Sequence, residues 1–135
     1  MLNFHHVALS VSDIQRSIAF YEQLGFKTVM DWKAEDNSLS IVQLKNGEAM
    51  LELFCYDSPQ VAPQSSAELG SDLQRIGVKH VGLKCDYIEE TKAELEARGV
   101  ASDIQITRGR TGIDYFFIRD PDGIFVEIVQ DDRGL

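Results

Sequence analysis

The sequence predicts an α+β fold made of two βαβββ modules within one domain. A chain of 135 residues has the usual size of one domain, and 44% hydrophobic residues suffice for a core. Residues 6–26, "HVALSVSDIQRSIAFYEQLGF", align without a gap on residues 80–100, "HVGLKCDYIEETKAELEARGV". Histidine meets histidine at the start of this alignment, and glycine meets glycine near its end. An internal repeat of this kind predicts two copies of one structural design.

Each repeat begins as a strand and continues as a helix. Residues 6–11 and 80–85 place apolar side chains at every second position, which is the period of a strand. Ser12, and Asp86 in the second repeat, then stand three residues before a carboxamide or a carboxylate. This is the spacing of a capping box and predicts the start of a helix. A glycine that can close each helix in the left-handed conformation follows: Gly25 and Gly99.

Three further strand-like runs follow each helix. They are "FKTVMDW", "SLSIVQL" and "AMLELFCY" in the first half, and "SDIQIT", "IDYFFIR" and "IFVEIVQ" in the second. The turns "KNGE" and "DPDG" suit a hairpin between the last two strands of each half. Module 1 is therefore expected to cover residues 1–56 and module 2 residues 78–131. The polar, proline-containing segment 57–77 is expected to link them, with residues 1–135 forming one domain.

The composition excludes two classes of partner. Lys and Arg number 13 against 22 Asp and Glu, and the net charge of −9 would repel a nucleic-acid backbone or an anionic membrane surface. No run approaches the roughly 18–20 apolar residues that span a bilayer, and the N-terminus lacks the pattern of a secretory signal. A soluble, cytoplasmic protein with small-molecule partners is therefore expected. Cys55 and Cys85 lie in apolar runs and are expected to be small buried thiols.

The alternation of side chains along the strands places four polar residues on the sheet faces that point away from the helices. In each half the apolar positions must face the helix, which turns the alternate positions to the other face of the sheet. That other face carries His6 and Glu52 in the first half, and His80 and Glu127 at matching places in the second. The residues beside the histidines on this face are small and leave room for another group: Ala8, Ser10 and Gly82.

A carboxylate within an apolar strand needs a partner, because burying it unpaired costs several kcal/mol. Two histidines could supply that partner through salt bridges. A divalent cation could also do so, since imidazole and carboxylate ligands suit Zn, Ni, Co, Mn or Fe. A concave surface lined with solvated polar groups is the third interpretation. The residues by themselves leave these three open.

The chain resembles the vicinal oxygen chelate superfamily, which includes glyoxalase I, methylmalonyl-CoA epimerase, extradiol dioxygenases and fosfomycin-resistance proteins. The similar segments are "HHVALSVSDIQRSIAFYEQLGF", "AMLELF", "KHVGLKC" and "RDPDGIFVEIVQ", which span nearly the whole chain. The most specific are the His-Val opening of each half and the Asp-Pro-Asp-Gly turn before Glu127. The resemblance implies curled mixed sheets that enclose one divalent metal ion per site. It also implies four metal ligands: His6, Glu52, His80 and Glu127.

The ligand set indicates a subfamily. Glutamate at the position of Glu52 is what glyoxalase I has, so the resemblance implies a glyoxalase I-like isomerase or lyase, similar to lactoylglutathione lyase. Such an enzyme acts through a metal-stabilised enediolate on a small α-oxygenated carbonyl or thioester substrate. Glu127 and Glu52 are then the candidate catalytic bases, with Glu127 preferred. Two alternatives remain: an epimerase-like or extradiol dioxygenase-like enzyme, and a drug-binding module of the bleomycin-resistance type without catalysis.

The resemblance does not extend to glutathione recognition. Similar bacterial glyoxalase I enzymes carry an arginine and an asparagine where this chain has Ser10 and Tyr56. A different, anionic substrate could be held by Lys84, Arg108 and Arg110, for which plain solvated charge is the alternative interpretation. Relatives often dimerise, so a homodimer is expected.

The adjacent histidines at the start of the chain are predicted to differ. His6 aligns with His80, whereas His5 aligns with Lys79, a residue type that is almost never buried unpaired. Consecutive strand residues point to opposite faces. His5 is therefore expected to lie exposed at the start of the strand, and its replacement to leave the metal content nearly unchanged.

Overall fold

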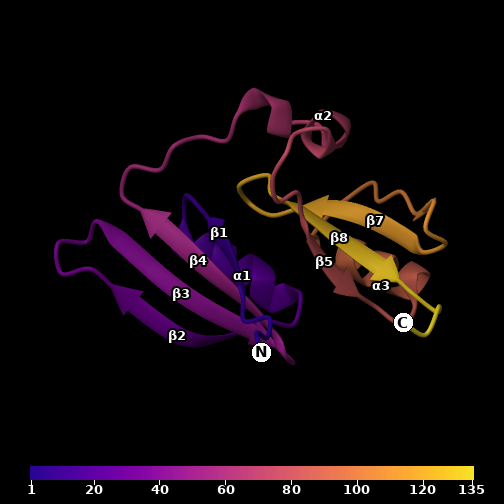
Figure 1. Ribbon diagram of the computed structural model, residues 1–135, viewed down its shortest axis with the longest axis horizontal. Helices are drawn as coiled ribbons and strands as arrows, with labels where there is room; N and C mark the ends of the chain where they lie inside the picture. Colours follow the sequence, from indigo (N-terminus) through magenta and orange to yellow (C-terminus); the bar gives the residue numbers. More distant parts are fainter. The chain divides into compact units, whose positions relative to one another are not determined.

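The computed structural model describes all of residues 1–135, which form two compact units, Met1–Ala62 and Pro63–Leu135. Each unit contains a four-stranded sheet, and the two sheets are separate (Figure 1). None of the helices is both long enough and apolar enough to cross a membrane.

The first unit has the predicted βαβββ order. Its elements are β1 (Val7–Ser10), α1 (Ile14–Gln23), β2 (Lys27–Lys33), β3 (Leu39–Asn46) and β4 (Ala49–Tyr56). The strand order is β1-β4-β3-β2, with β1 parallel to β4 and the other pairs antiparallel. The helix α1 packs on one face of this sheet (Figure 1).

The second unit repeats this topology after two short helical turns. Its elements are the 3₁₀ turn η1 (Gln64–Ser66), α2 (Leu69–Leu73), β5 (Val81–Lys84), α3 (Ile88–Ala97), β6 (Thr107–Arg108), β7 (Asp114–Arg119) and β8 (Phe125–Gln130). The strand order is β5-β8-β7-β6, again with one parallel pair. Both sheets are mixed and open, which confirms the α+β class and the two βαβββ copies.

The predicted helix caps were misplaced by one residue. In α1 the N-cap is Asp13, whose Oδ1 accepts a hydrogen bond from the Arg16 amide at 3.0 Å. In α3 the N-cap is Tyr87, which has no side-chain cap bond. The Ile88 amide instead donates to Oε1 of Gln130 on β8 at 2.9 Å, so a tertiary contact satisfies this helix end.

Both predicted helix-closing glycines are confirmed. Gly25 and Gly99 have φ angles of +91° and +69°, which a residue with a Cβ rarely adopts. At Gly25 an added Cβ would also lie 3.1 Å from Nδ2 of Asn46, an atom that donates to the Leu24 carbonyl.

Two predicted segments differ from the structure. The expected linker contains η1 and α2, because its polar groups pair locally. The buried Asp72 accepts a hydrogen bond from the Ser66 hydroxyl through Oδ1. The same oxygen lies 3.5 Å from Nζ of Lys79. Of the expected strand 102–107 only Thr107 is in a strand, because β6 consists of Thr107 and Arg108. Its apolar residue Ile104 is buried, and its amide donates to Oε1 of Glu96 on α3 rather than to a strand.

Strand parity predicted part of each core. Six of the apolar positions assigned to the helix side of the sheets are buried: Leu9, Val11, Leu51, Leu53, Val126 and Ile128. The other assigned positions are half-buried: Val7, Cys55, Val81, Leu83, Cys85 and Ile124. Phe125 is also buried although parity turns it to the opposite face, because Phe117 packs on its edge and the Arg119 guanidinium lies 4.1 Å from its ring centre. Cys55 and Cys85 are free thiols, half-buried rather than fully buried.

The Asp-Pro-Asp-Gly turn joins β7 to β8 and sets the register that places Glu127 opposite Phe117. Oδ1 of the buried Asp120 accepts hydrogen bonds from the amides of Asp122 and Ile124, both at 2.9 Å. Replacing Asp120 by alanine leaves these donors without that acceptor.

We expect Asp120→Ala to lower the free energy of unfolding by about 1–3 kcal/mol. Urea denaturation followed by circular dichroism measures this loss. Glu35→Ala, which changes an exposed acidic residue, is the control and is expected to lie within about 0.5 kcal/mol of wild type. Equal stability of the two variants would contradict the role given to Asp120.

Candidate metal centre

In the first unit the structure brings His6 and Glu52 together. β4 pairs with β1 so that Glu52 lies beside Ala8. Ala8 is two residues after His6 in the sequence. Nε2 of His6 lies 3.4 Å from Oε1 of Glu52, with the two side chains 34% and 16% exposed.

Gln43 is a member of this site that the sequence analysis did not single out. It lies directly opposite Glu52 in the β3–β4 register, and its Nε2 donates to Oε2 of Glu52 at 2.6 Å. One oxygen of Glu52 therefore faces the histidine while the other is held by an amide. The alternation of "SLSIVQL" puts Gln43 on the same face as Glu52, and that signal could have identified it.

In the second unit His80 and Glu127 form the corresponding pair. Glu127 lies beside Gly82 in the β5–β8 register, and its Oε2 is 3.1 Å from Nε2 of His80. An added Cβ at Gly82 would lie 3.8 Å from the same oxygen, so a small residue here keeps the carboxylate accessible. The residue opposite Glu127 is Phe117, whose ring stands edge-on to His80 with centroids 5.1 Å apart.

The second nitrogens of the two histidines have different surroundings. Nδ1 of His6 lies 2.8 Å from Nδ1 of the exposed His5, which precedes it in the chain. Nδ1 of His80 is buried and has no hydrogen-bond partner. The exposure of His5 agrees with the prediction, but its contact with His6 was not expected.

The donor atoms fit a divalent metal. Two ligands that each lie about 2.1 Å from one metal ion, at a right or tetrahedral angle, are about 3.0–3.4 Å apart. The Nε2 to carboxylate separations in the two units, 3.4 and 3.1 Å, are of this size. No group of three or more His, Cys, Asp or Glu side chains that could hold a metal gathers in the structure, and each unit shows one histidine–glutamate pair.

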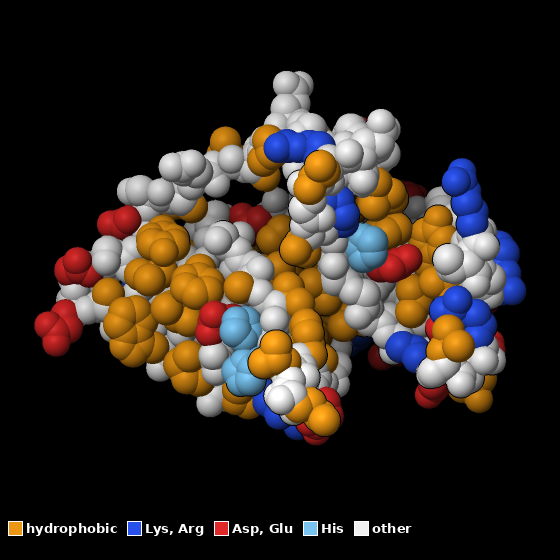
Figure 2. Space-filling model, viewed as in Figure 1, with side chains coloured by type: hydrophobic (Ala, Val, Ile, Leu, Met, Phe, Trp, Pro, Cys, Tyr) orange, Lys and Arg blue, Asp and Glu red, His pale blue; other side chains and the backbone are white.

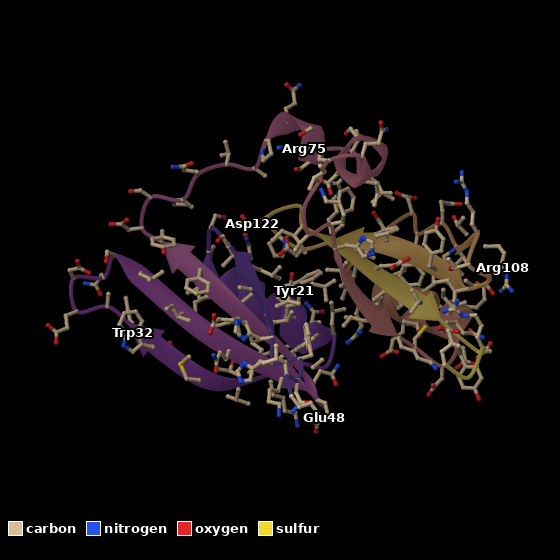
Figure 3. All side chains as sticks on the ribbon, in the orientation of Figure 1. Tyr21, Trp32, Glu48, Arg75, Arg108 and Asp122 are labelled. Atoms are coloured by element: carbon tan, nitrogen blue, oxygen red, sulfur yellow. The ribbon has the colours of Figure 1, made fainter.

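The three basic residues predicted to hold an anion, Lys84, Arg108 and Arg110, lie on different elements and have different surroundings. Lys84 ends β5, exposed, on the same face as Gly82. Arg108 on β6 is 67% exposed, and its Nη1 lies 3.2 Å from Oδ2 of Asp114 (Figure 3). Arg110 is exposed in the following loop. The solvated-charge interpretation suits both arginines, and Lys84 remains the candidate on the face that carries His80.

Apolar side chains cover one part of the face that carries Glu52. Register pairs place Trp32 beside Ile41 and Ile41 beside Phe54, on the face that Glu52 and Gln43 share. Trp32 on β2 (labelled in Figure 3) is 49% exposed. Tyr56 at the end of β4 is 50% exposed. Hydrophobic side chains gather over these strands, as Figure 2 shows. An exposed apolar surface of this kind is typical of a site that contacts another molecule.

Two βαβββ units in one chain, each with a histidine in contact with a glutamate, place the protein in the class of paired βαβββ folds. The chain belongs to the Glyoxalase/Bleomycin resistance protein/Dioxygenase superfamily, whose sequence profile matches residues 3–128.

Individual relatives agree with this membership. The uncharacterized protein YwkD of Bacillus subtilis is 26% identical over 133 residues, covering 95% of this chain and 96% of its own. A lactoylglutathione lyase of Schizosaccharomyces pombe is 30% identical over 94% of this chain, which covers 44% of that longer protein. The crystal structure of a glyoxalase family protein from Enterococcus faecalis superposes with a TM-score of 0.76 at 29% identity, covering 94% of this chain and 96% of its own.

Proposed function

We propose that this protein is a metal-dependent enzyme of the glyoxalase I-like class, a lyase or isomerase of a small α-oxygenated carbonyl or thioester. The observation that carries the proposal is the repeated contact between a histidine Nε2 and a glutamate oxygen, at 3.4 Å in one unit and 3.1 Å in the other. The lactoylglutathione lyase among the relatives supports the same reaction class.

The residues that would hold the metal are His6, Glu52, His80 and Glu127, and the ion would be Zn, Ni, Co, Mn or Fe. When bound, the metal supplies Lewis-acid stabilisation of negative charge on a substrate oxygen. The two imidazoles would hold the ion, and the two carboxylates would complete its ligand set or accept the substrate proton.

Glu127 is the proposed base that removes this proton and returns it to the neighbouring carbon. Its neighbours differ from those of Glu52 in one respect. Gln43 holds one oxygen of Glu52, whereas the residue opposite Glu127 is the apolar Phe117. Both oxygens of Glu127 therefore stay free of amide donors, and one of them can move a proton while the other faces His80.

Gln43→Leu tests the support of Glu52. The substitution keeps the side-chain size but removes the amide donor, so Glu52 is expected to lose its fixed orientation. Removing an outer partner of a metal ligand typically costs roughly 10- to 100-fold in metal affinity. Competition with a chromophoric chelator measures this loss for Zn²⁺ or Co²⁺. Gln23→Leu on α1 is the control, and equal affinities of the two variants would contradict the role of Gln43.

The substrate is tested with a panel of compounds. We expect turnover of a hemithioacetal, and we expect methylmalonyl-CoA and catechol to be poor substrates. Preference for methylmalonyl-CoA would favour the epimerase-like alternative, and ring cleavage of catechol the dioxygenase-like alternative. Because Ser10 and Tyr56 stand where similar enzymes hold glutathione, the panel includes hemithioacetals of glutathione and of a smaller thiol.

The exposed apolar face around Trp32 favours a second candidate, capture of an aromatic small molecule without turnover. Metal analysis of protein purified without chelators separates the two functions. About one equivalent of a divalent transition metal supports the enzyme, and its absence supports the binding module.

A further inference from the structure

The two adjacent histidines at the start of the chain contact each other through their rings. Nδ1 of His5 lies 2.8 Å from Nδ1 of His6, which is within hydrogen-bond distance. The rings meet edge to face, with centroids 5.1 Å apart and planes at 82°. This contact forms because β1 begins only at Val7, so the alternation of a strand does not separate the two side chains.

A hydrogen bond between two ring nitrogens needs a proton on one of them and a free lone pair on the other. Nε2 of His6 faces Glu52, the direction in which it would meet a metal ion. A neutral histidine that offers Nε2 to a metal carries its proton on Nδ1. In that state Nδ1 of His6 donates, and Nδ1 of His5 accepts.

The second unit lacks such a partner. Nδ1 of His80 is buried without a hydrogen-bond partner, and the residue before it is Lys79, whose ammonium group pairs with Asp72. The hydrogen bond at Nδ1 is thus present at His6 but not at His80, its equivalent in the other repeat.

We propose that His5 is a positioning residue, which holds His6 in the Nδ1-protonated tautomer with Nε2 free for the metal. This inference rests on the proposed function in so far as His6 binds a metal. Metal-bound histidines generally donate their second ring proton to an outer acceptor, whose loss lowers metal affinity. His5→Phe is therefore expected to weaken metal binding, in contrast to the expectation from the sequence.

Two variants separate hydrogen bonding from packing. His5→Phe keeps a ring beside His6 but removes the acceptor. His5→Asn restores an acceptor, because its Oδ1 occupies nearly the position of the histidine Nδ1. We expect roughly 10- to 100-fold weaker Zn²⁺ or Co²⁺ affinity for His5→Phe and affinity close to wild type for His5→Asn.

Long-range ¹H–¹⁵N correlation spectra of Zn²⁺-loaded protein, labelled with ¹⁵N-histidine, report whether an acceptor holds the Nδ1 proton of His6. The metal-loaded state is needed because in metal-free protein Nε2 of His6 faces the Glu52 carboxylate, which competes for the ring proton. We expect a slowly exchanging, downfield-shifted Nδ1 proton in wild type and His5→Asn, and a faster-exchanging, less shifted one in His5→Phe. An unchanged Nδ1 proton signal in His5→Phe would overturn the proposal, and so would a His5→Asn variant that behaves like His5→Phe. If wild type binds no metal, the proposed function fails and this inference with it, whereas equal metal affinity of wild type and His5→Phe overturns this inference alone.

Discussion

Glu127→Gln is expected to abolish turnover while the metal stays bound. The amide has the shape of the carboxylate and keeps an oxygen that can face the metal, but it cannot accept the substrate proton. A positioned base contributes roughly 10²- to 10⁴-fold to the rate. We therefore expect kcat on the best hemithioacetal substrate to fall by about that factor, measured beside the metal content of the same preparation.

Glu52→Gln is the matched comparison because it alters the equivalent residue of the other unit. If Glu127 is the base, Glu52→Gln should retain more activity than Glu127→Gln at equal metal occupancy. Isomerase activity retained by metal-loaded Glu127→Gln would show that another group moves the proton.

His80→Ala has the second large expected effect, the loss of the bound metal. Removal of this imidazole deletes one of four proposed ligands and leaves Glu127 without the only basic side chain within ion-pair distance. Elemental analysis after purification without chelators should show about one equivalent of metal in wild type and a small fraction of that in the variant.

Glu90→Gln, which changes an exposed carboxylate on α3 in the same unit, is the control for His80→Ala and should retain the metal. A circular dichroism spectrum equal to that of wild type shows that the variant is folded. Full metal content in a folded His80→Ala protein would exclude His80 as a ligand.

Much of this fold could be predicted because its information is local and periodic. The gapless repeat identified both strand-helix openings, and period-two alternation identified the helix-facing residues, from Leu9 to Ile128. The same alternation grouped His6 with Glu52 and His80 with Glu127 in each half, and the structure shows both pairs in contact. Their joint role as one ligand set stays a prediction.

The errors have two different physical causes. The N-cap of α1 is Asp13 and not Ser12, because both residue types can cap a helix and only the local backbone conformation selects between them. Ile104 lies outside a strand, and its amide donates to Glu96 on α3, which is a tertiary contact. Neither outcome follows from residue spacing alone.

Sequence alone therefore determined the repeated βαβββ design and the sheet face on which Glu52 and Glu127 lie, because side-chain direction follows from strand periodicity. The two histidines precede their strands, and the structure shows that each contacts a glutamate. Only the tertiary structure determined which further side chains contact these histidines and glutamates. The β3–β4 register placed the amide of Gln43 on Glu52, while the β7–β8 register placed the ring of Phe117 opposite Glu127. The start of β1 at Val7 allowed His5 to reach His6. Register and element boundaries arise from contacts between distant segments, and these contacts make two similar histidine–glutamate pairs chemically different.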